Sequence, residues 1–358
     1  MPRTPEPQQT PEEPVQRLHR LARIEDAVQR WRERRGRRRG LIATIVPFTG
    51  YGSTRWVRVL CRVQLAKPEA TAKALVDNPR GWRSFARIHV GHALVTVTAG
   101  GESREVRADR GGVVDLRVDV ELTPGWHEIE IAVEGSEPVR APVFIVAPDI
   151  DFGLVSDIDD TVMVTALPRP FLAAWNTFVL NEHARRPVAG MSVLYERLKR
   201  EHPGAPVVYL STGAWNVAPV LTRFLERNLY PQGALLLTDW GPTHDRWFRS
   251  GQEHKRTSLR RLGEEFPDIR WLLVGDDGQH DPELYGEFAA DHPSSVAGVA
   301  IRQLSTSEAV LAGGRSHVRE EDVEEVPAFA SPDGAGLSEQ LSAAGILPPD
   351  TFPHYKRL

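Results

Sequence analysis

The sequence has a single cysteine, Cys61, among its 358 residues, so no disulfide can form within the chain. It also lacks any run of about 18 apolar residues, the length that makes a segment a candidate membrane-spanning helix. The first residues, MPRTPEPQQTPEEP, have no apolar stretch behind their one basic residue and predict no secretory signal. These absences predict a reducing, cytoplasmic location and an ordinary core position for Cys61.

The net charge of −4 is small, but it conceals a strongly basic segment. Ten arginines and three acids lie between Arg17 and Arg39, and apolar residues recur there every three or four positions, at Leu18, Leu21, Ile24, Val28 and Trp31. This period predicts a basic amphipathic helix over residues 17–40. Either its apolar stripe docks on the protein body, or its basic face attaches the protein peripherally to an anionic membrane. We expect no nucleic-acid partner.

Before and after this helix the composition predicts two very different segments. Residues 1–16 are rich in proline, glutamate and glutamine, which predicts a disordered tail. Residues 41–148 contain short runs of alternating apolar and polar residues, such as WVRVLCRVQL and WHEIEIAVEG, separated by turn residues. This spacing is typical of an all-β antiparallel sandwich of roughly seven strands. Because it holds no cluster of acidic, histidine or cysteine residues, we interpret it as an accessory domain.

Residues 149–312 have the pattern of an α/β domain. The apolar runs FGLVSD, PVVYLST, WLLVGDD and SVAGVAIR alternate with helical stretches, which predicts a Rossmann-type parallel sheet with helices on both faces. Ligands of such sheets bind beyond the carboxyl ends of the strands, so chemistry is expected where these runs end. Residues 313–358 are predicted to form a C-terminal tail, to which we assign no chemistry.

The first strand end carries the sequence Asp157-Ile158-Asp159-Asp160-Thr161. A carboxylate at Asp157 can attack phosphorus and form an aspartyl phosphate. A second carboxyl group at Asp159 can protonate the leaving oxygen and then deprotonate water. The alternative is an acidic turn that caps a helix, with Asp160 and Thr161 as the cap.

Two further positions offer groups that bind phosphate. Ser211 follows an apolar strand and precedes Thr212 and Gly213, so a hydroxyl and free backbone N–H groups are expected at the same edge. Lys255 lies in HKRTSLRRL, at the start of a predicted helix. We count Thr161, Ser211, Thr212 and Lys255 as phosphate-binding candidates. Taken singly, Ser211 is also consistent with a helix N-cap and Lys255 with a solvated lysine.

The last motif, WLLVGDDGQHD, places Asp276, Asp277 and Asp281 after an apolar strand. A phosphatase needs a cation to neutralise charge, and Mg²⁺ binds oxygen ligands while keeping several waters. We therefore expect Mg²⁺ at Asp157 and Asp276, helped by Asp281 and by a backbone carbonyl at Asp159. An acidic turn is the alternative for Asp276 alone.

The motifs DxDxT, strand-serine, lysine and GDxxxxD, in this order, resemble those of the haloacid dehalogenase (HAD) superfamily. More specifically, SDIDDT, YLSTGAWN, YPQGALLLTDWG and GDDGQHDPELY resemble the catalytic domain of actin-patch-associated phosphatidate phosphatases over roughly residues 150–305. The GYGS segment and the sandwich resemble the N-terminal part of bacterial members. Thr212-Gly213-Ala214 and Gly275-Asp276-Asp277-Gly278 depart from the family pattern, but neither change removes a catalytic group.

This resemblance implies Mg²⁺-dependent hydrolysis of phosphatidate to diacylglycerol and phosphate. It implies Asp157 as nucleophile, Asp159 as acid and base, Ser211 and Lys255 as phosphate ligands, and Asp276 as a metal ligand. The alternatives are a phosphatase of a soluble phosphate ester and a non-catalytic phospholipid-binding module. Arg302 is expected to be an ordinary solvated arginine, with contact to the substrate as the alternative. His280 is expected to order its loop through a hydrogen bond, with a catalytic role as the alternative.

Overall fold

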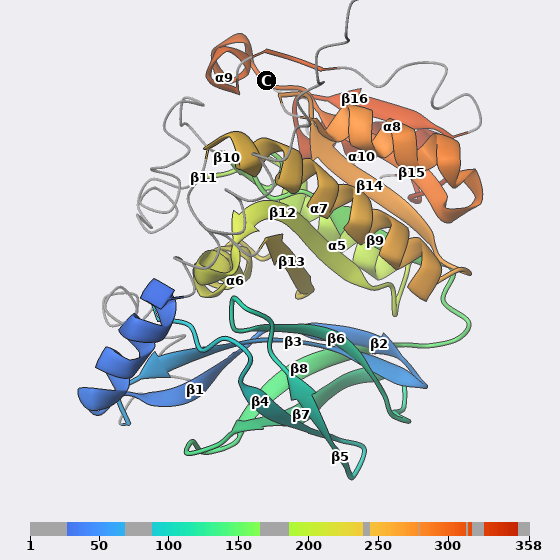
Figure 1. The fold of residues 1–358 in the computed structure, drawn as a ribbon. Coiled ribbons are helices and arrows are strands. Elements are labelled where there is room, and N and C mark those ends of the chain that lie inside the picture. Colours follow the sequence, from blue (N-terminus) through green and yellow to red (C-terminus); the bar gives the residue numbers. More distant parts are fainter. Residues whose placement is uncertain are drawn as a thin grey trace, which may run out of the picture.

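The computed structural model describes residues 27–68, 88–164, 186–238, 244–278, 280–312, 314–316 and 326–349. Within these residues an N-terminal helix is followed by two large sheets, one below the other in the view of Figure 1. The tail predicted over residues 1–16 lies outside the described residues. None of the helices in the described part of the chain is long and apolar enough to span a bilayer.

The first sheet contains eight strands: β1 (Ile42–Pro47), β2 (Gly50–Ser53), β3 (Trp56–Ala66), β4 (Leu94–Ala99), β5 (Glu102–Arg107), β6 (Val113–Asp119), β7 (Gly125–Val133) and β8 (Val139–Val146). Their order is β1-β3-β2-β8-β7-β4-β5, and β6 pairs with β3. The expected purely antiparallel pairing is wrong at one place, because β2 runs parallel to β8. These two strands are far apart in the sequence, so no hairpin fixes their relative direction.

The apolar alternation in these strands marks the residues that are buried together. Val59 and Cys61 of β3 share one core cluster with Ile45 of β1, Ile131 of β7 and Ile145 of β8. Cys61 is fully buried, as the sequence predicts, and burial raises the pKa of its thiol to about 12. The cysteine is therefore an unreactive core residue.

The second sheet contains six parallel strands in the order β13-β12-β9-β14-β15-β16. They are β9 (Phe152–Ser156), β12 (Val207–Ala214), β13 (Ala234–Thr238), β14 (Arg270–Asp276), β15 (Val296–Arg302) and β16 (Ala328–Ser331). The chain runs outward from β9 to β12 and β13, then returns to the other side of β9 with β14. This change of direction predicts a ligand site at the carboxyl ends of β9 and β14.

Helices cover the parallel sheet: α5 (Met191–Glu201), α6 (Ala218–Arg227), α7 (His244–Glu265), α8 (Asp281–Asp291), α9 (Thr306–Ala312) and α10 (Gly334–Ala343). Figure 1 shows α7 in front of the sheet and α5 behind it. In α5 the buried residues recur every three or four positions, at Met191, Leu194, Tyr195 and Leu198. This period places one apolar stripe against the sheet, as the sequence predicts for an α/β domain. A short ribbon of β10 (Met163–Val164) and β11 (Arg186–Pro187) adjoins the sheet's first loop.

The C-terminal residues extend the α/β domain beyond the boundary expected at residue 312. Strand β16 pairs with β15, and α10 buries Leu337 and Leu341 in the same core. Leu347 is also buried there. Residues 326–349 are therefore part of the domain, whereas the sequence pattern assigned them to a tail. The pattern was misleading because an edge strand of four residues is too short to show a period.

The two sheets share a packed interface. The rings of Phe48 and Trp215 stack with their centroids 4.6 Å apart. The hydroxyl of Tyr51 donates to Glu265 at 2.8 Å, and Arg58 donates to the same carboxylate at 2.6 Å. The GYGS segment therefore belongs to the contact between the eight-stranded sheet and α7.

The basic N-terminal helix is described over residues 27–38, and its earlier part lies outside the described residues. It contacts the eight-stranded sheet through Gly36, where an added Cβ would lie 2.6 Å from Leu65, and through Gln29, which donates to the His89 carbonyl at 2.8 Å. Val28 and Trp31 are 44% and 57% exposed. Docking through the apolar stripe is therefore wrong for these two residues, because a glycine and an amide make the contact.

Candidate active site

The predicted site residues of the first and last motifs meet where β9 and β14 end side by side. Asp157 follows β9 directly, and Asp276 is the last residue of β14. The backbone N–H of Asp157 donates to the Val274 carbonyl at 2.8 Å, which ties the two strand ends together. Both side chains are buried. The parallel sheet thus brings together two acids that are far apart in the sequence.

A buried lysine joins this pair to a third acid. The Lys255 ammonium donates to Asp157 Oδ1 at 2.8 Å and to Asp281 Oδ1 at 2.5 Å. Asp281 is the first residue of α8, so the loop after β14 and the body of α7 both contribute to the site. The expectation that Lys255 starts a helix is wrong, because α7 begins at His244. The alternative of a solvated lysine is also wrong, because Lys255 is only 3% exposed.

Helix α7 passes close to β12 one turn before Lys255. A Cβ added at Gly251 of α7 would lie 3.0 Å from the Thr212 side chain. Gly251 therefore permits a close approach that a larger residue would hinder. The approach brings the following turn of α7, with Lys255, over the strand ends.

Three carboxylate oxygens of this cluster have no hydrogen-bond partner among the described residues. They are Asp157 Oδ2, Asp276 Oδ2 and Asp281 Oδ2, and all three are buried. These residues offer ligand atoms that lie within 4.8 Å of one another. A buried oxygen without a partner is costly, and a bound cation would satisfy all three. An all-oxygen set of this kind fits Mg²⁺, which prefers hard oxygen ligands.

The charge balance of the cluster also favours a cation. Burial raises the pKa of Asp157 and of Asp276 well above the usual carboxylate range, because a buried charge loses its hydration; at Asp157 the Lys255 ammonium opposes this shift. Burial alone would lower the pKa of Lys255, but the carboxylates of Asp157 and Asp281 outweigh it and raise that pKa. The single lysine charge is therefore paired with two of the three buried acids, Asp157 and Asp281.

Asp159 lies close enough to Asp157 for its charge to help raise the pKa of that residue. Its Oδ2 accepts a hydrogen bond from Ser211 Oγ at 3.2 Å, across the ends of β9 and β12. Its carboxylate is not part of the three-acid group, and metal binding through its backbone carbonyl stays a prediction. The chain turns sharply at Asp160, which has a φ of 57°. Aspartate tolerates this left-handed conformation better than most residues.

The remaining phosphate-binding candidates differ in what surrounds them. Thr161 is fully buried, and its hydroxyl has no hydrogen-bond partner among the described residues. Thr212 is half-buried in β12, and its carbonyl accepts a hydrogen bond from Thr238. The expected free N–H at Gly213 is wrong, because this group donates to Ser211 Oγ at 3.0 Å. Ser211 thus connects the β12 turn with Asp159.

Arg302 is an important residue that the sequence pattern misassigned. It is 6% exposed rather than solvated, and its guanidinium donates to the Asp160 carbonyl at 2.8 Å and to Glu308 at 2.8 Å. Its position at the end of β15, the strand next to β14, is the signal that identifies it. Arg302 therefore supports the turn that carries Asp159.

Two residues of the last motif have roles away from the cluster. Asp277 accepts a hydrogen bond from the Leu304 backbone at 2.8 Å, which fixes the loop after β15. His280 Nδ1 lies 3.6 Å from a carboxylate oxygen of Glu283, too far for a hydrogen bond, so its expected loop-ordering hydrogen bond stays a prediction. Residues 165–185, which include Phe171, Trp175 and Phe178, lie outside the described residues.

Comparisons with known proteins match the part of the chain that carries the site. Residues 152–303 match the family model described as phosphatidate phosphatase APP1, catalytic domain. The chain is 26% identical to phosphatidate phosphatase APP1 of Saccharomyces cerevisiae over 207 residues, which are 56% of this chain and 34% of that protein. It is also 26% identical to an uncharacterized protein of Schizosaccharomyces pombe over 152 residues, which are 42% of this chain and 25% of that one.

The chain therefore spans about a third or less of the length of these curated relatives. Among solved structures, a HAD family hydrolase of Deinococcus radiodurans with bound phosphate and sodium matches at 13% identity and a TM-score of 0.31. That match covers 56% of this chain and all of the other.

Proposed function

Because residues 152–303 belong to the family of APP1-type phosphatidate phosphatase catalytic domains, we propose that this protein is a Mg²⁺-dependent phosphatidate phosphatase with a HAD-type mechanism. The observation that carries the proposal is the set of three buried carboxylate oxygens without partners, on Asp157, Asp276 and Asp281. They are held beside a lysine that neutralises only part of their charge. This arrangement suits a cation and a phosphoryl group better than it suits folding alone.

In the proposed reaction a carboxylate oxygen of Asp157 attacks the phosphorus of phosphatidate. The bond between phosphorus and the glycerol oxygen breaks, and protonated Asp159 gives its proton to that oxygen, which leaves as diacylglycerol. Asp159 then takes a proton from a water molecule, whose oxygen attacks the aspartyl phosphate. Inorganic phosphate is released and the Asp157 carboxylate is restored.

The other residues would stabilise the negative charge of the carboxylates and the phosphoryl group during these two steps. A Mg²⁺ ion at Asp157, Asp276 and Asp281 would offset the negative charge of the carboxylates and the phosphoryl oxygens. The Lys255 ammonium is fixed by two acids, so it can bind a phosphoryl oxygen without reorganising. The hydroxyls of Ser211, Thr161 and Thr212 are the proposed neutral donors to the same group.

The assay that tests this function measures phosphate release from phosphatidate in mixed micelles and from soluble phosphate esters. Both substrates are tested with Mg²⁺, with EDTA, and with Mg²⁺ restored after EDTA. We expect phosphatidate turnover that is lost in EDTA and recovered with Mg²⁺. Turnover of soluble esters alone would refute the lipid substrate, and no release from any substrate would favour a non-catalytic phospholipid-binding module.

A further inference from the structure

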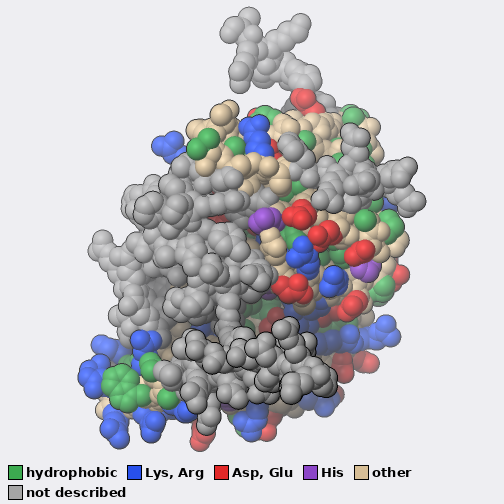
Figure 2. Space-filling model, turned by 45° about the horizontal axis from the view of Figure 1, so that its top comes forward, with side chains coloured by type: hydrophobic (Ala, Val, Ile, Leu, Met, Phe, Trp, Pro, Cys, Tyr) green, Lys and Arg blue, Asp and Glu red, His purple; other side chains and the backbone are tan. Residues whose placement is uncertain are grey.

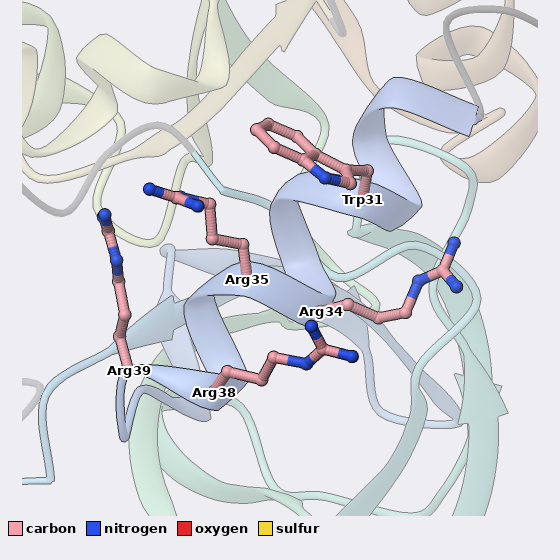
Figure 3. A pocket seen from close by; sticks show the side chains of 5 residues that line it. All are labelled: Trp31, Arg34, Arg35, Arg38 and Arg39. Atoms are coloured by element: carbon pink, nitrogen blue, oxygen red, sulfur yellow. The ribbon is translucent and has the colours of Figure 1, made fainter.

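The N-terminal helix presents a basic face that the proposed catalytic mechanism does not use. Gln29 and Gly36 occupy its contact with the eight-stranded sheet. The opposite side carries Trp31, Arg34, Arg35, Arg38 and Arg39, which we call the arginine–tryptophan face. These five residues line an open hollow of about 300 Å³ (Figure 3).

An exposed tryptophan lies at the N-terminal end of this face. Trp31 is 57% exposed, and Val28, one turn earlier on the helix, is 44% exposed. The Arg35 guanidinium lies 5.6 Å from the centroid of the Trp31 ring and on the same side of the helix (Figure 3). In Figure 2 a group of basic side chains surrounds exposed hydrophobic side chains at the lower left, the end where Figure 1 places the helix.

The positive charge of this face is poorly neutralised. Residues 27–40 contain seven arginines and one acid, Glu33, which pairs with Arg37 at 3.0 Å. Within the described ranges Arg35, Arg38 and Arg39 form no ion pair. Unpaired like charges this close repel one another, so an anionic partner would relieve the repulsion.

We propose that the arginine–tryptophan face docks the protein on the surface of an anionic lipid bilayer. Tryptophan is enriched at the membrane–water interface, where its amphipathic ring lies among the headgroups. The negative surface potential of anionic lipids attracts the arginines beside it. The exposed pair of Val28 and Trp31 favours this surface over a nucleic acid, because a bilayer interface accepts an aliphatic side chain among basic ones.

This docking goes beyond the proposed reaction and does not depend on it. A protein without phosphatase activity would still adsorb to vesicles through the helix. Binding is therefore measured by sedimentation of the full chain with vesicles of phosphatidylcholine, with and without phosphatidylglycerol. Hydrolysis of a soluble phosphate ester is measured on the same samples, so that a failure of docking and a failure of catalysis are told apart.

The main variant is the double substitution Arg35→Gln/Arg38→Gln, and its matched control is Arg104→Gln/Arg140→Gln. The control removes the same charge from exposed arginines of the eight-stranded sheet, each of which pairs with a glutamate. We expect the helix variant to lower the vesicle partition coefficient by on the order of tenfold, since each basic residue near an anionic surface contributes measurably. The control should change the coefficient less than about twofold, because its arginines lie outside the arginine–tryptophan face and each already has an acidic partner.

Trp31→Ala supplies an independent measurement that leaves all charges in place. We expect it to lower the partition coefficient while the remaining adsorption keeps its dependence on salt. The proposal would be overturned if the helix variant and its control lowered the partition coefficient equally, or if Trp31→Ala left adsorption unchanged. Equal adsorption of the wild type to neutral and to anionic vesicles would also overturn it. Binding of the wild type to single-stranded RNA but not to anionic vesicles would overturn it in favour of a nucleic-acid partner.

Discussion

The two sheets of this protein differ in whether they bury charged side chains. Among residues 42–66 and 88–146 no charged side chain is buried, and ion pairs such as Arg140–Glu128 are more than half exposed. At the carboxyl edge of the parallel sheet, by contrast, Asp157, Asp276 and Asp281 are all buried. Buried charges cost free energy unless they are fully paired, and Lys255 pairs with only two of these acids, Asp157 and Asp281.

This difference indicates that the eight-stranded sheet serves stability, whereas the carboxyl edge of the parallel sheet holds the candidate active site. The eight-stranded sheet follows the ordinary rules of folding, with apolar residues inside and charges outside. The edge of the parallel sheet breaks these rules at several positions, and three of them, Asp157, Asp276 and Asp281, meet at one point. Violations of this kind are expected at functional sites, where the cost is offset by the packing of the rest of the fold.

The largest expected effect is on turnover in Asp157→Asn. An amide cannot act as the nucleophile, so we expect phosphate release to fall by at least about a thousandfold. The unfolding midpoint in EDTA should not fall, because the substitution removes a buried charge while the amide oxygen can still accept the hydrogen bond from Lys255. The matched control is Asp119→Asn in the eight-stranded sheet, whose side chain is 82% exposed. A well-folded Asp157→Asn protein with the wild-type rate would rule out the nucleophile assignment.

The acids at the strand ends could be predicted from the sequence, and the reason is topological. Asp157 and Asp276 each end an apolar run, and parallel strands end at the same edge of their sheet. Polar groups whose positions depend on tertiary packing were harder to predict from the sequence. Lys255 comes from the interior of α7, and Arg302 looks like a surface residue until β15 is placed beside β14.

The limits of domains were harder to predict than their cores. Strand β16 and helix α10 follow a polar stretch, so their sequence resembled a tail although Leu337 and Leu341 are buried. The parallel pair of β2 and β8 likewise leaves no local signal, because the pairing depends on the whole path of the chain. The exposure of Trp31 could not be predicted either, because a helical stripe does not show which side of the helix docks.

The second expected effect concerns metal binding and stability together. Mg²⁺ at 100 times its Kd should stabilise the wild type by about 2.7 kcal/mol, because it binds the folded state alone. Asp276→Asn removes one proposed ligand and one buried acid, so it should lose most of this gain yet unfold at a higher temperature than the wild type in EDTA. Thermal unfolding with and without Mg²⁺ measures both quantities, and Asp119→Asn again serves as the control.

An Asp276→Asn protein that is less stable than the wild type in EDTA would contradict the contrast between the two sheets. It would mean that the acid at this strand end stabilises the fold in the absence of metal, as an ordinary buried hydrogen-bonding group does. The hydrogen bond from the Gly278 backbone to Asp276 Oδ1, at 2.7 Å, survives in the variant, because an asparagine carbonyl accepts it equally well. The comparison therefore isolates the charge and the unpartnered oxygen.

The smallest expected effect is that of Arg302, which lies beside the site but does not belong to the three-acid cluster. Arg302→Gln loses the bond to the Asp160 carbonyl, so we expect kcat to fall by about tenfold while KM stays nearly constant, as for residues that orient catalytic ligands. Arg302→Lys should restore part of the rate, because lysine keeps the charge but not the planar fork. Glu308→Gln removes only the ion pair and should have a weaker effect. A change in KM alone, with kcat unaltered, would instead mean that Arg302 acts on substrate binding and not on the position of Asp159.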